Sequence, residues 1–193
     1  MSKTPVCCPW CLAGELETKY HDEEWGVPLR DDRGQFEFMT LESAQAGLSW
    51  STILKKREGY RRCFAEFDPV KVAAFTAKDE ERLMNDAGIV RNRLKIKAAV
   101  HNARLFLDVG ARHGGFATYL WSFVDGKPVK NAWKRQDQIP ATTPLSDAVA
   151  NELKRIGFKF MGSTIVYAHM QATGLVNDHL VSCFRYNQVG ARR

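Results

Sequence analysis

The sequence lacks long hydrophobic runs, and none approaches the roughly 20 apolar residues that span a bilayer. It also lacks an apolar signal segment, because its first residues lead directly into cysteines. We therefore expect a cytoplasmic protein with no membrane partner. There is no internal repeat or low-complexity segment, and 193 residues suit one compact domain, 1–193, or two helical subdomains that share a cleft.

Alternating β-branched stretches are absent as well, whereas helical spacing of apolar residues is common. In the longest predicted helix, over 91–112, apolar residues recur three and four apart, and Gly114 follows. The polar stretch 125–142 predicts a surface loop. Shorter helices are expected over 35–46, 49–56, 69–74, 79–86, 144–156 and 163–173, and around His179 and Cys183. These patterns predict an all-α fold.

The charge balance indicates the class of binding partner, and the cysteines indicate the kind of covalent or metal site to expect. The formal net charge of +6 favours a polyanionic partner, nucleic acid first, although this signal alone is weak. Five cysteines are an odd number, and a reducing compartment is expected, so the sequence does not predict a disulfide framework. Three cysteines lie near the N-terminus and Cys183 lies near the C-terminus, which raises the alternative of a metal site.

His179 and Cys183 are four residues apart, so on a helix both side chains could reach one ion. The other ligands would come from the N-terminal candidates Cys7, Cys8, Cys11 and His21. Cys8 and Cys11 form a Cys-x-x-Cys pair, which gives one possible set with His179 and Cys183. Spacing alone slightly favours another interpretation, in which Cys183 is a small buried hydrophobe and His179 is a hydrogen-bonded core histidine.

The segment between the helices 144–156 and 163–173 could bind a phosphodiester. Gly157 and Gly162 allow positive φ and close approach of another backbone. The helix that begins at Ser163 presents free N–H groups, and Lys159 adds positive charge. The alternative is an ordinary helix–loop–helix turn whose glycines only cap helices, which is the more common case.

Two stretches, 20–28 and 41–50, are dense in aromatic and polar residues. Aromatic faces can stack on an extruded base, and a fixed acceptor can read its edge. Glu42 could be that acceptor. The candidate aromatic faces are Trp10, Tyr20, Trp25 and Trp50. The alternative is that the aromatics belong to the core and that Glu42 is solvated, as glutamates on helices usually are.

Several specific segments recur together over about residues 8–183. They are Cys8-Pro9-Trp10, 20–28, Leu41-Glu42, 45–50, 54–58, 67–69, 121–123, 157–160, 170–172 and 174–179. In this combination the chain resembles the type I 3-methyladenine DNA glycosylases, a branch of the helix-hairpin-helix glycosylases. The resemblance implies an all-α fold with a helix-hairpin-helix at about 144–174. Gly157, Lys159, Gly162 and Ser163 would contact alkylated double-stranded DNA, and we expect a monomer.

The resemblance also implies a metal site and a base pocket. One structural zinc ion would tie the two ends of the chain together through Cys8, His21, His179 and Cys183. Four protein ligands leave no open position for an activated water. Glu42 would be the catalytic, base-reading residue, with Tyr20 and Trp50 in the same pocket and Trp10 and Trp25 as further walls. Glu17 stands where the family has a tyrosine.

The reaction that the resemblance implies is hydrolysis of the N-glycosidic bond of 3-methyladenine in DNA. The methylated base is cationic in the nucleotide and neutral after release, so it is already an activated leaving group. That fits a sequence without an obvious carboxylate pair of the glycosidase kind. A role for Glu42 in orienting the attacking water is a further hypothesis. Two alternative interpretations of the sequence are a non-catalytic DNA-binding module and a metallohydrolase that uses the Cys/His site for chemistry.

Overall fold

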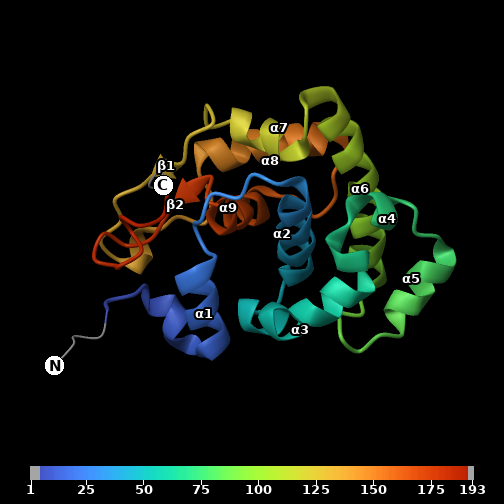
Figure 1. Cartoon of the computed structure of the whole chain (residues 1–193), viewed down its shortest axis with the longest axis horizontal. Helices are drawn as coiled ribbons and strands as arrows, with labels where there is room; N and C mark the ends of the chain where they lie inside the picture. The colour runs from blue at the N-terminus through green and yellow to red at the C-terminus, as the bar shows by residue number, and fades with distance from the viewer. Residues whose placement is uncertain (1–4, 191–193) are drawn as a thin grey trace.

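The computed structural model describes residues 5–190, and its regular structure is mostly helical (Figure 1). The α-helices are α1 (Glu15–Glu23), α2 (Asp32–Gln45), α3 (Trp50–Cys63), α4 (Pro69–Ala73), α5 (Ala77–Met84), α6 (Arg93–His113), α7 (Phe116–Ser122), α8 (Pro144–Ile156) and α9 (Ser163–Ala172). Three 3-10 helices and two strands are short: η1 (Pro9–Ala13), η2 (Ala65–Phe67), η3 (Gln136–Gln138), β1 (Val129–Lys130) and β2 (Val176–Asn177). The strands pair in parallel. The helical class expected from the sequence is confirmed.

Local capping chemistry explains why several helices begin and end where the sequence predicts. The Asp68 side chain accepts hydrogen bonds from two backbone N–H groups at the start of α4. Thr143 caps α8, which has a proline in its first turn and ends at Gly157 with φ 112°. The long helix α6 ends at Gly114 with φ 72°. These signals lie in a few consecutive residues, so sequence alone specifies them.

Other elements differ from the prediction. The helices α1 and α7 were not expected, and α3 continues past 56 to Cys63. The expected helix around His179 and Cys183 is wrong, because residues 181–190 form consecutive turns. The loop 125–142 contains β1 and η3. Contacts with distant segments fix the C-terminal turns, since the backbone N–H of Phe184 donates to the carbonyl of Val6, 2.8 Å away.

Helix α2 lies at the centre of the molecule and packs against α3, α6, α7 and α9 (Figure 1). Its residues from Gln35 to Ala44 are all buried. Because α2 is surrounded from Gln35 to Ala44, this part of the helix has no solvated face on which a charged side chain could lie. A glutamate on this helix is therefore buried, contrary to the usual expectation for a helical glutamate.

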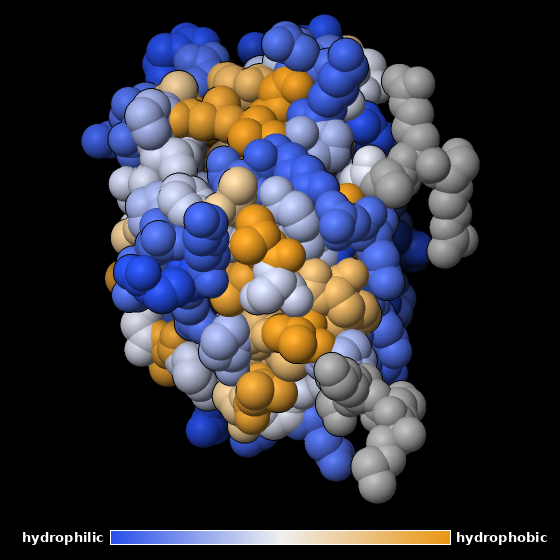
Figure 2. Space-filling view, turned by 90° about the vertical axis from the view of Figure 1, so that its left-hand side faces the viewer, coloured by the Kyte–Doolittle hydropathy of each residue, from blue (hydrophilic) through white to orange (hydrophobic). Residues whose placement is uncertain are grey.

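The hydrophobic core has a large cluster, formed mainly by α2, α3, α6, α7, α8 and α9, and a smaller cluster beside the ends of the chain. The smaller cluster comprises Cys8, Tyr20, Trp25, Phe38, Ala172, Leu180 and Cys183. Trp50 and Ile139 pack against both. On the side of α1 and the C-terminal segment, hydrophobic patches alternate with hydrophilic residues (Figure 2). Among residues 5–190, the helices are all too short or too polar to cross a membrane.

Candidate base pocket and Cys/His cluster

A cavity of about 330 Å³ lies where the N-terminal helices meet α9 and the loop before α8. Its lining residues are Trp10, Tyr20, Trp25, Glu42, Gln45, Trp50, Gln136, Ile139, Ala168 and Gln171. The structure therefore brings together all five side chains that the sequence analysis named for a base pocket. A cavity of this size is within the range of small-molecule sites.

The aromatic walls pack against one another from separate segments. The Trp10 ring, in η1, lies 5.1 Å from the Trp25 ring at an angle of 73°. The Tyr20 ring, on α1, lies 5.2 Å from the Trp50 ring at the start of α3. Trp50 is placed by its helix N-cap, Ser49, whose hydroxyl accepts from the backbone N–H of Thr52. Such mutually packed rings are held rigidly and present fixed faces.

Glu42 is the charged group of this pocket. Its side chain is only 4% exposed, and among the described residues no protein group donates a hydrogen bond to its carboxylate. Burial raises the pKa of Glu42 from its ordinary value of 4.5 to about 8. The carboxyl group is therefore mostly protonated at neutral pH, and a cation in the pocket would favour its ionised form.

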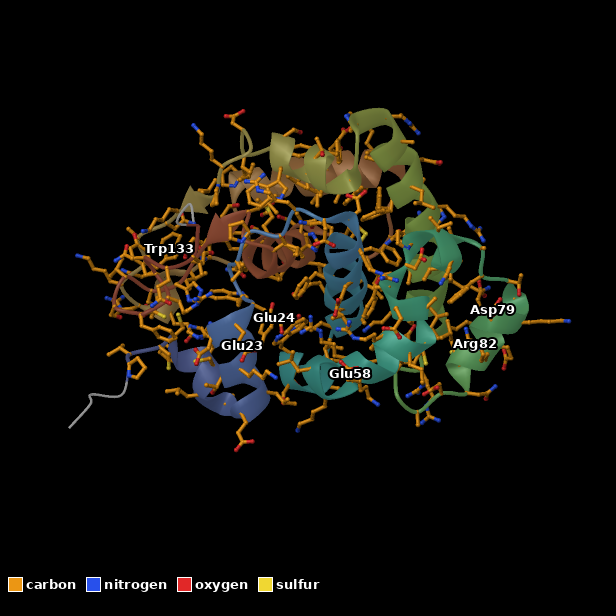
Figure 3. The ribbon with its side chains drawn as sticks, viewed as in Figure 1. Glu23, Glu24, Glu58, Asp79, Arg82 and Trp133 are labelled. Carbon is orange, nitrogen blue, oxygen red and sulfur yellow. The ribbon has the colours of Figure 1, made fainter. Side chains whose placement is uncertain are left out.

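A charged network supports the pocket from behind. Arg57, on α3, donates to both carboxylate oxygens of Glu24 at 2.7 Å and to Glu37 at 2.7 Å. Its guanidinium lies 5.4 Å from the Phe38 ring, which in turn packs 6.1 Å from the Tyr20 ring. Figure 3 shows Glu24 at the end of α1, facing α3. This network fixes α1 against α3 and so fixes Tyr20.

The second candidate site is a buried cluster of two cysteines and two histidines. The ligand atoms of Cys8, His21, His179 and Cys183 all lie within 4.8 Å of one another. The spacing-based alternative with Cys11 in place of His21 is not the group that the fold assembles. Cys11 is buried in η1, yet it is not part of this group. The four residues could hold a metal ion.

The distances in the cluster suit one tetrahedral ion. The sulfur–nitrogen separations are 3.7 Å for Cys8–His179, 3.4 Å for Cys183–His21 and 3.6 Å for Cys183–His179. The two histidine nitrogens lie 3.1 Å apart. Zinc–sulfur and zinc–nitrogen bonds of ordinary length give about 3.5 Å between sulfur and nitrogen in a tetrahedron. The donor set and its spacing therefore fit zinc.

The histidines of the cluster are oriented from outside. The Nδ1 of His21 lies 2.7 Å from the Asp22 carboxylate, and the Nε2 of His179 lies 3.0 Å from the carbonyl of Trp25. In each ring the nitrogen that faces away from the cluster thus has a hydrogen-bond acceptor. This is the usual arrangement around metal-binding histidines, because it fixes the tautomer that leaves the other nitrogen free.

The cluster and the pocket share walls. The Trp25 ring lies 4.6 Å from the His179 ring, and the Trp10 ring lies 5.5 Å from the His21 ring. Trp10 and Trp25 therefore face the pocket on one side and the cluster on the other. Any ion in the cluster would act on the pocket by holding these two walls.

The segment between α8 and α9 is tied to the centre of the molecule. Asn102, on α6, exchanges two hydrogen bonds with the backbone of Lys159, at 2.8 and 2.9 Å. The hydroxyl of Ser43, next to Glu42, donates to the carbonyl of Phe160 at 3.3 Å. Lys159 and Phe160 are exposed at the tip. The loop is thus held in a fixed position relative to the pocket.

One expectation for this segment needs correction. Gly157 has the expected positive φ, but Gly162 has φ −71° in an extended conformation that any residue can adopt. The hydroxyl of Ser163 is engaged with α8, because it donates to the Asp147 carboxylate at 2.5 Å and contacts the Ser146 hydroxyl at 2.8 Å. The side chain of Ser163 therefore joins the two helices.

Sequence reasoning missed the amide side chains of the pocket. Gln45 and Gln171 lie in segments that carry the family resemblance, and this resemblance could have pointed to them. No sequence pattern pointed to Gln136, which also lines the pocket. Glu17 is buried in α1, but it does not line the pocket. Residues of the same amide type line the pocket from three separate segments.

Comparisons with known proteins agree with this geometry. The methyladenine glycosylase family matches residues 10–186. DNA-3-methyladenine glycosylase 1 of Escherichia coli (strain K12) is 51% identical over 179 residues, which cover 93% of this chain and 96% of the relative. A crystal structure of 3-methyladenine DNA glycosylase I is 52% identical with a TM-score of 0.88, and covers 93% of this chain and 98% of that one. A tyrosine-to-phenylalanine variant of such an enzyme, in complex with 3-methyladenine, is 38% identical with a TM-score of 0.89, and covers 92% and 95%.

Proposed function

This chain belongs to the methyladenine glycosylase family, and from that premise we propose that it excises 3-methyladenine from alkylated DNA. It is an enzyme that hydrolyses an N-glycosidic bond in DNA repair. The observation that carries the proposal is a buried carboxyl group, Glu42, which has no hydrogen-bond partner among residues 5–190 and lies in a pocket walled by aromatic rings. Such a pocket suits a flat base that has been extruded from the duplex.

Glu42 selects the damaged base by charge. The pKa of Glu42 is raised to about 8 in the free protein, so its ionised form is costly until a positive charge enters. A 3-methyladenine nucleotide brings that charge, and undamaged adenine does not. The aromatic faces of Tyr20 and Trp50 then stack on the cationic ring. Binding is therefore stronger for the methylated base than for the normal one.

The bond that breaks joins the sugar carbon to the base nitrogen. Its electron pair moves to the base, which neutralises the positive charge of the ring and makes the base a good leaving group. Water adds to the sugar carbon and loses one proton, which leaves an abasic site. We assign Glu42 the role of binding the cationic base and accepting a hydrogen bond from its amine. The base is already an activated leaving group, so no second carboxylate is needed.

We propose zinc as the ion of the Cys8, His21, His179 and Cys183 cluster. Thiolate and imidazole ligands suit zinc, and four protein ligands complete its coordination. When bound, the ion supplies structural restraint and no reaction step. It would join η1 and α1 to the C-terminal turns and hold the walls Trp10 and Trp25 in place.

We propose that the helix-hairpin-helix α8–loop–α9 grips the duplex. The exposed Lys159 supplies positive charge, and the backbone from Gly157 to Ser163, at the N-terminus of α9, approaches a phosphate. We also propose that the chain forms one compact domain, in which two helical subdomains share the cleft that holds the pocket. We propose that the protein acts as a monomer, since the four cluster residues and the described lining of the pocket come from a single chain.

The test is to incubate the protein with methylated duplex DNA and to identify the released base by chromatography. Release of 3-methyladenine is expected, whereas duplex binding without release would favour the non-catalytic module. A chelator distinguishes the metallohydrolase. It should lower thermal stability, and activity should fall only as the fold loosens. Complete loss of activity in a folded protein would contradict the structural role of the ion.

A further inference from the structure

Asp178 is a fully buried carboxylate that accepts four hydrogen bonds. Its Oδ1 accepts from the side-chain amide of Asn131 and the indole N–H of Trp133, each at 2.7 Å. Its Oδ2 accepts from the hydroxyl of Tyr167 at 2.5 Å and the side-chain amide of Gln171 at 2.8 Å. Each oxygen therefore receives two donors, which fills the acceptor capacity of the carboxylate.

This arrangement fixes which way the Gln171 amide points. A carboxylate only accepts hydrogen bonds, so the NH₂ group of Gln171 must face Asp178. Its other polar atom, Oε1, has no hydrogen-bond partner among residues 5–190, and the side chain lines the base pocket. A hydrogen-bond acceptor of fixed orientation is thus left for a ligand.

The other amides of the pocket are not held in this way. Within the described chain, neither the Gln45 nor the Gln136 side chain has a hydrogen-bond partner that would select one amide orientation. Either amide could rotate to present a donor or an acceptor. Gln171 alone among the three lining glutamines has its choice made by a buried partner.

We propose that Gln171 is a specificity-determining residue whose amide oxygen accepts a hydrogen bond from the exocyclic amine of 3-methyladenine. This inference rests on the proposed function. The exocyclic amine carries the N–H donors of this base while it is attached to the sugar, and it has two hydrogens. Glu42 takes one and Gln171 takes the other. A base with a carbonyl oxygen at that position would set two acceptors against each other.

Asp178 is the positioning residue for this contact, and it connects the contact to the rest of the site. Trp133 anchors the loop that carries the pocket residues Gln136 and Ile139, and Figure 3 shows Trp133 on that loop beside the C-terminal segment. The next residue, His179, belongs to the Cys/His cluster. One carboxylate thus aligns α9, the loop and the C-terminal turns around the base.

The test compares two free bases in binding to the full chain, measured by calorimetry. The bases are 3-methyladenine and 3-methylpurine, which has hydrogen in place of the amine. In Gln171→Met, which keeps the side-chain length, affinity for 3-methyladenine should fall about tenfold, as for one lost hydrogen bond. Affinity for 3-methylpurine should stay within about twofold of wild type. The matched control is Gln188→Met, an exposed glutamine outside the pocket, which should change neither value.

Asp178→Leu provides the second variant, because it has a similar shape but removes both acceptor oxygens and so the group that orients the amide. It should weaken 3-methyladenine binding more than 3-methylpurine binding, whereas general damage to the pocket would weaken both equally. Equal affinities of wild type and Gln171→Met for 3-methyladenine would overturn the inference, as would equal losses for both bases in the two variants. Failure of the wild-type protein to bind 3-methyladenine would instead refute the proposed function itself.

Discussion

The Cys/His cluster and the base pocket are two buried polar regions built from the same segments, and they treat their polar groups in opposite ways. In the cluster, four ligand atoms face one another within 4.8 Å, and each histidine has an acceptor behind it. In the pocket, Glu42 is buried with no donor from the described chain. The polar groups of the cluster lie against one another, whereas the carboxyl group of the pocket has no partner from residues 5–190.

The two regions therefore contribute to the free energy of unfolding with opposite signs. Burying a polar group costs free energy unless a partner compensates. An ion would compensate the cluster permanently, so the cluster stabilises the fold. A cationic base compensates Glu42 only while it is bound, so the pocket is destabilising when empty and selective when filled.

The largest effect should follow from removing one ligand of the cluster. Cys8→Ser should abolish binding of the metal ion and lower the free energy of unfolding by on the order of 5 kcal/mol. Cys11→Ser is the matched control, because Cys11 is also buried and lies three residues away but outside the group. It should retain one ion per chain. Metal analysis and denaturant unfolding measure both values, and an ion lost from Cys11→Ser but kept in Cys8→Ser would reverse the ligand assignment.

Ionisation of Glu42 should change the free energy of unfolding by a comparable amount as the pH rises. Its pKa rises from 4.5 when unfolded to about 8 in the native protein, so this group's contribution to stability is fully present below about pH 4.5 and is lost as pH rises through 8. At roughly 1.4 kcal/mol per pKa unit, ionisation costs on the order of 5 kcal/mol. Glu42→Gln should therefore unfold like wild type at pH 5 and be several kcal/mol more stable at pH 9. If the free energies of unfolding of Glu42→Gln and wild type differed by the same amount at both pH values, Glu42 could not be a buried carboxyl group without a partner.

The same substitution should act in the opposite direction on activity. Glu42→Gln should lower the rate of 3-methyladenine release at limiting DNA concentration by on the order of 100-fold, because the negative charge that binds the extruded cationic base is gone. Affinity for undamaged duplex should stay nearly unchanged. Glu58→Gln, an exposed glutamate on α3 whose position Figure 3 shows, is the control and should remain fully active. Undiminished release by Glu42→Gln would remove Glu42 from the mechanism.

The smallest effect concerns the hairpin, which belongs to neither region. Lys159→Ala should weaken duplex binding by several-fold and reduce the slope of log affinity against log salt by about 1, the value for one phosphate contact. Lys78→Ala, an exposed lysine on α5, should leave the slope unchanged. Fluorescence anisotropy at several salt concentrations measures both. Identical slopes for Lys159→Ala and wild type would exclude this contact.

Local signals made much of the fold predictable. Asp68, Thr143 and Gly157 specify helix ends because capping depends on neighbouring residues, and the observed helices begin or end there. The same reasoning failed at His179 and Cys183. Their spacing of four suggested a helix, yet neither residue is helical, and the irregular C-terminal segment places both side chains in the cluster. Spacing restricts which residues can meet, and a helix is only one way to satisfy it.

The sequence by itself determined the helical class and, through its resemblance, the family and a set of candidate residues. Only the tertiary structure decided which of them meet. It buries Glu42, because α2 is enclosed by other helices, and it brings His21 rather than Cys11 to the cluster. It also turns the Gln171 amide through Asp178, seven residues away along the chain. Burial and hydrogen-bond partners depend on distant segments, so no local pattern contains them.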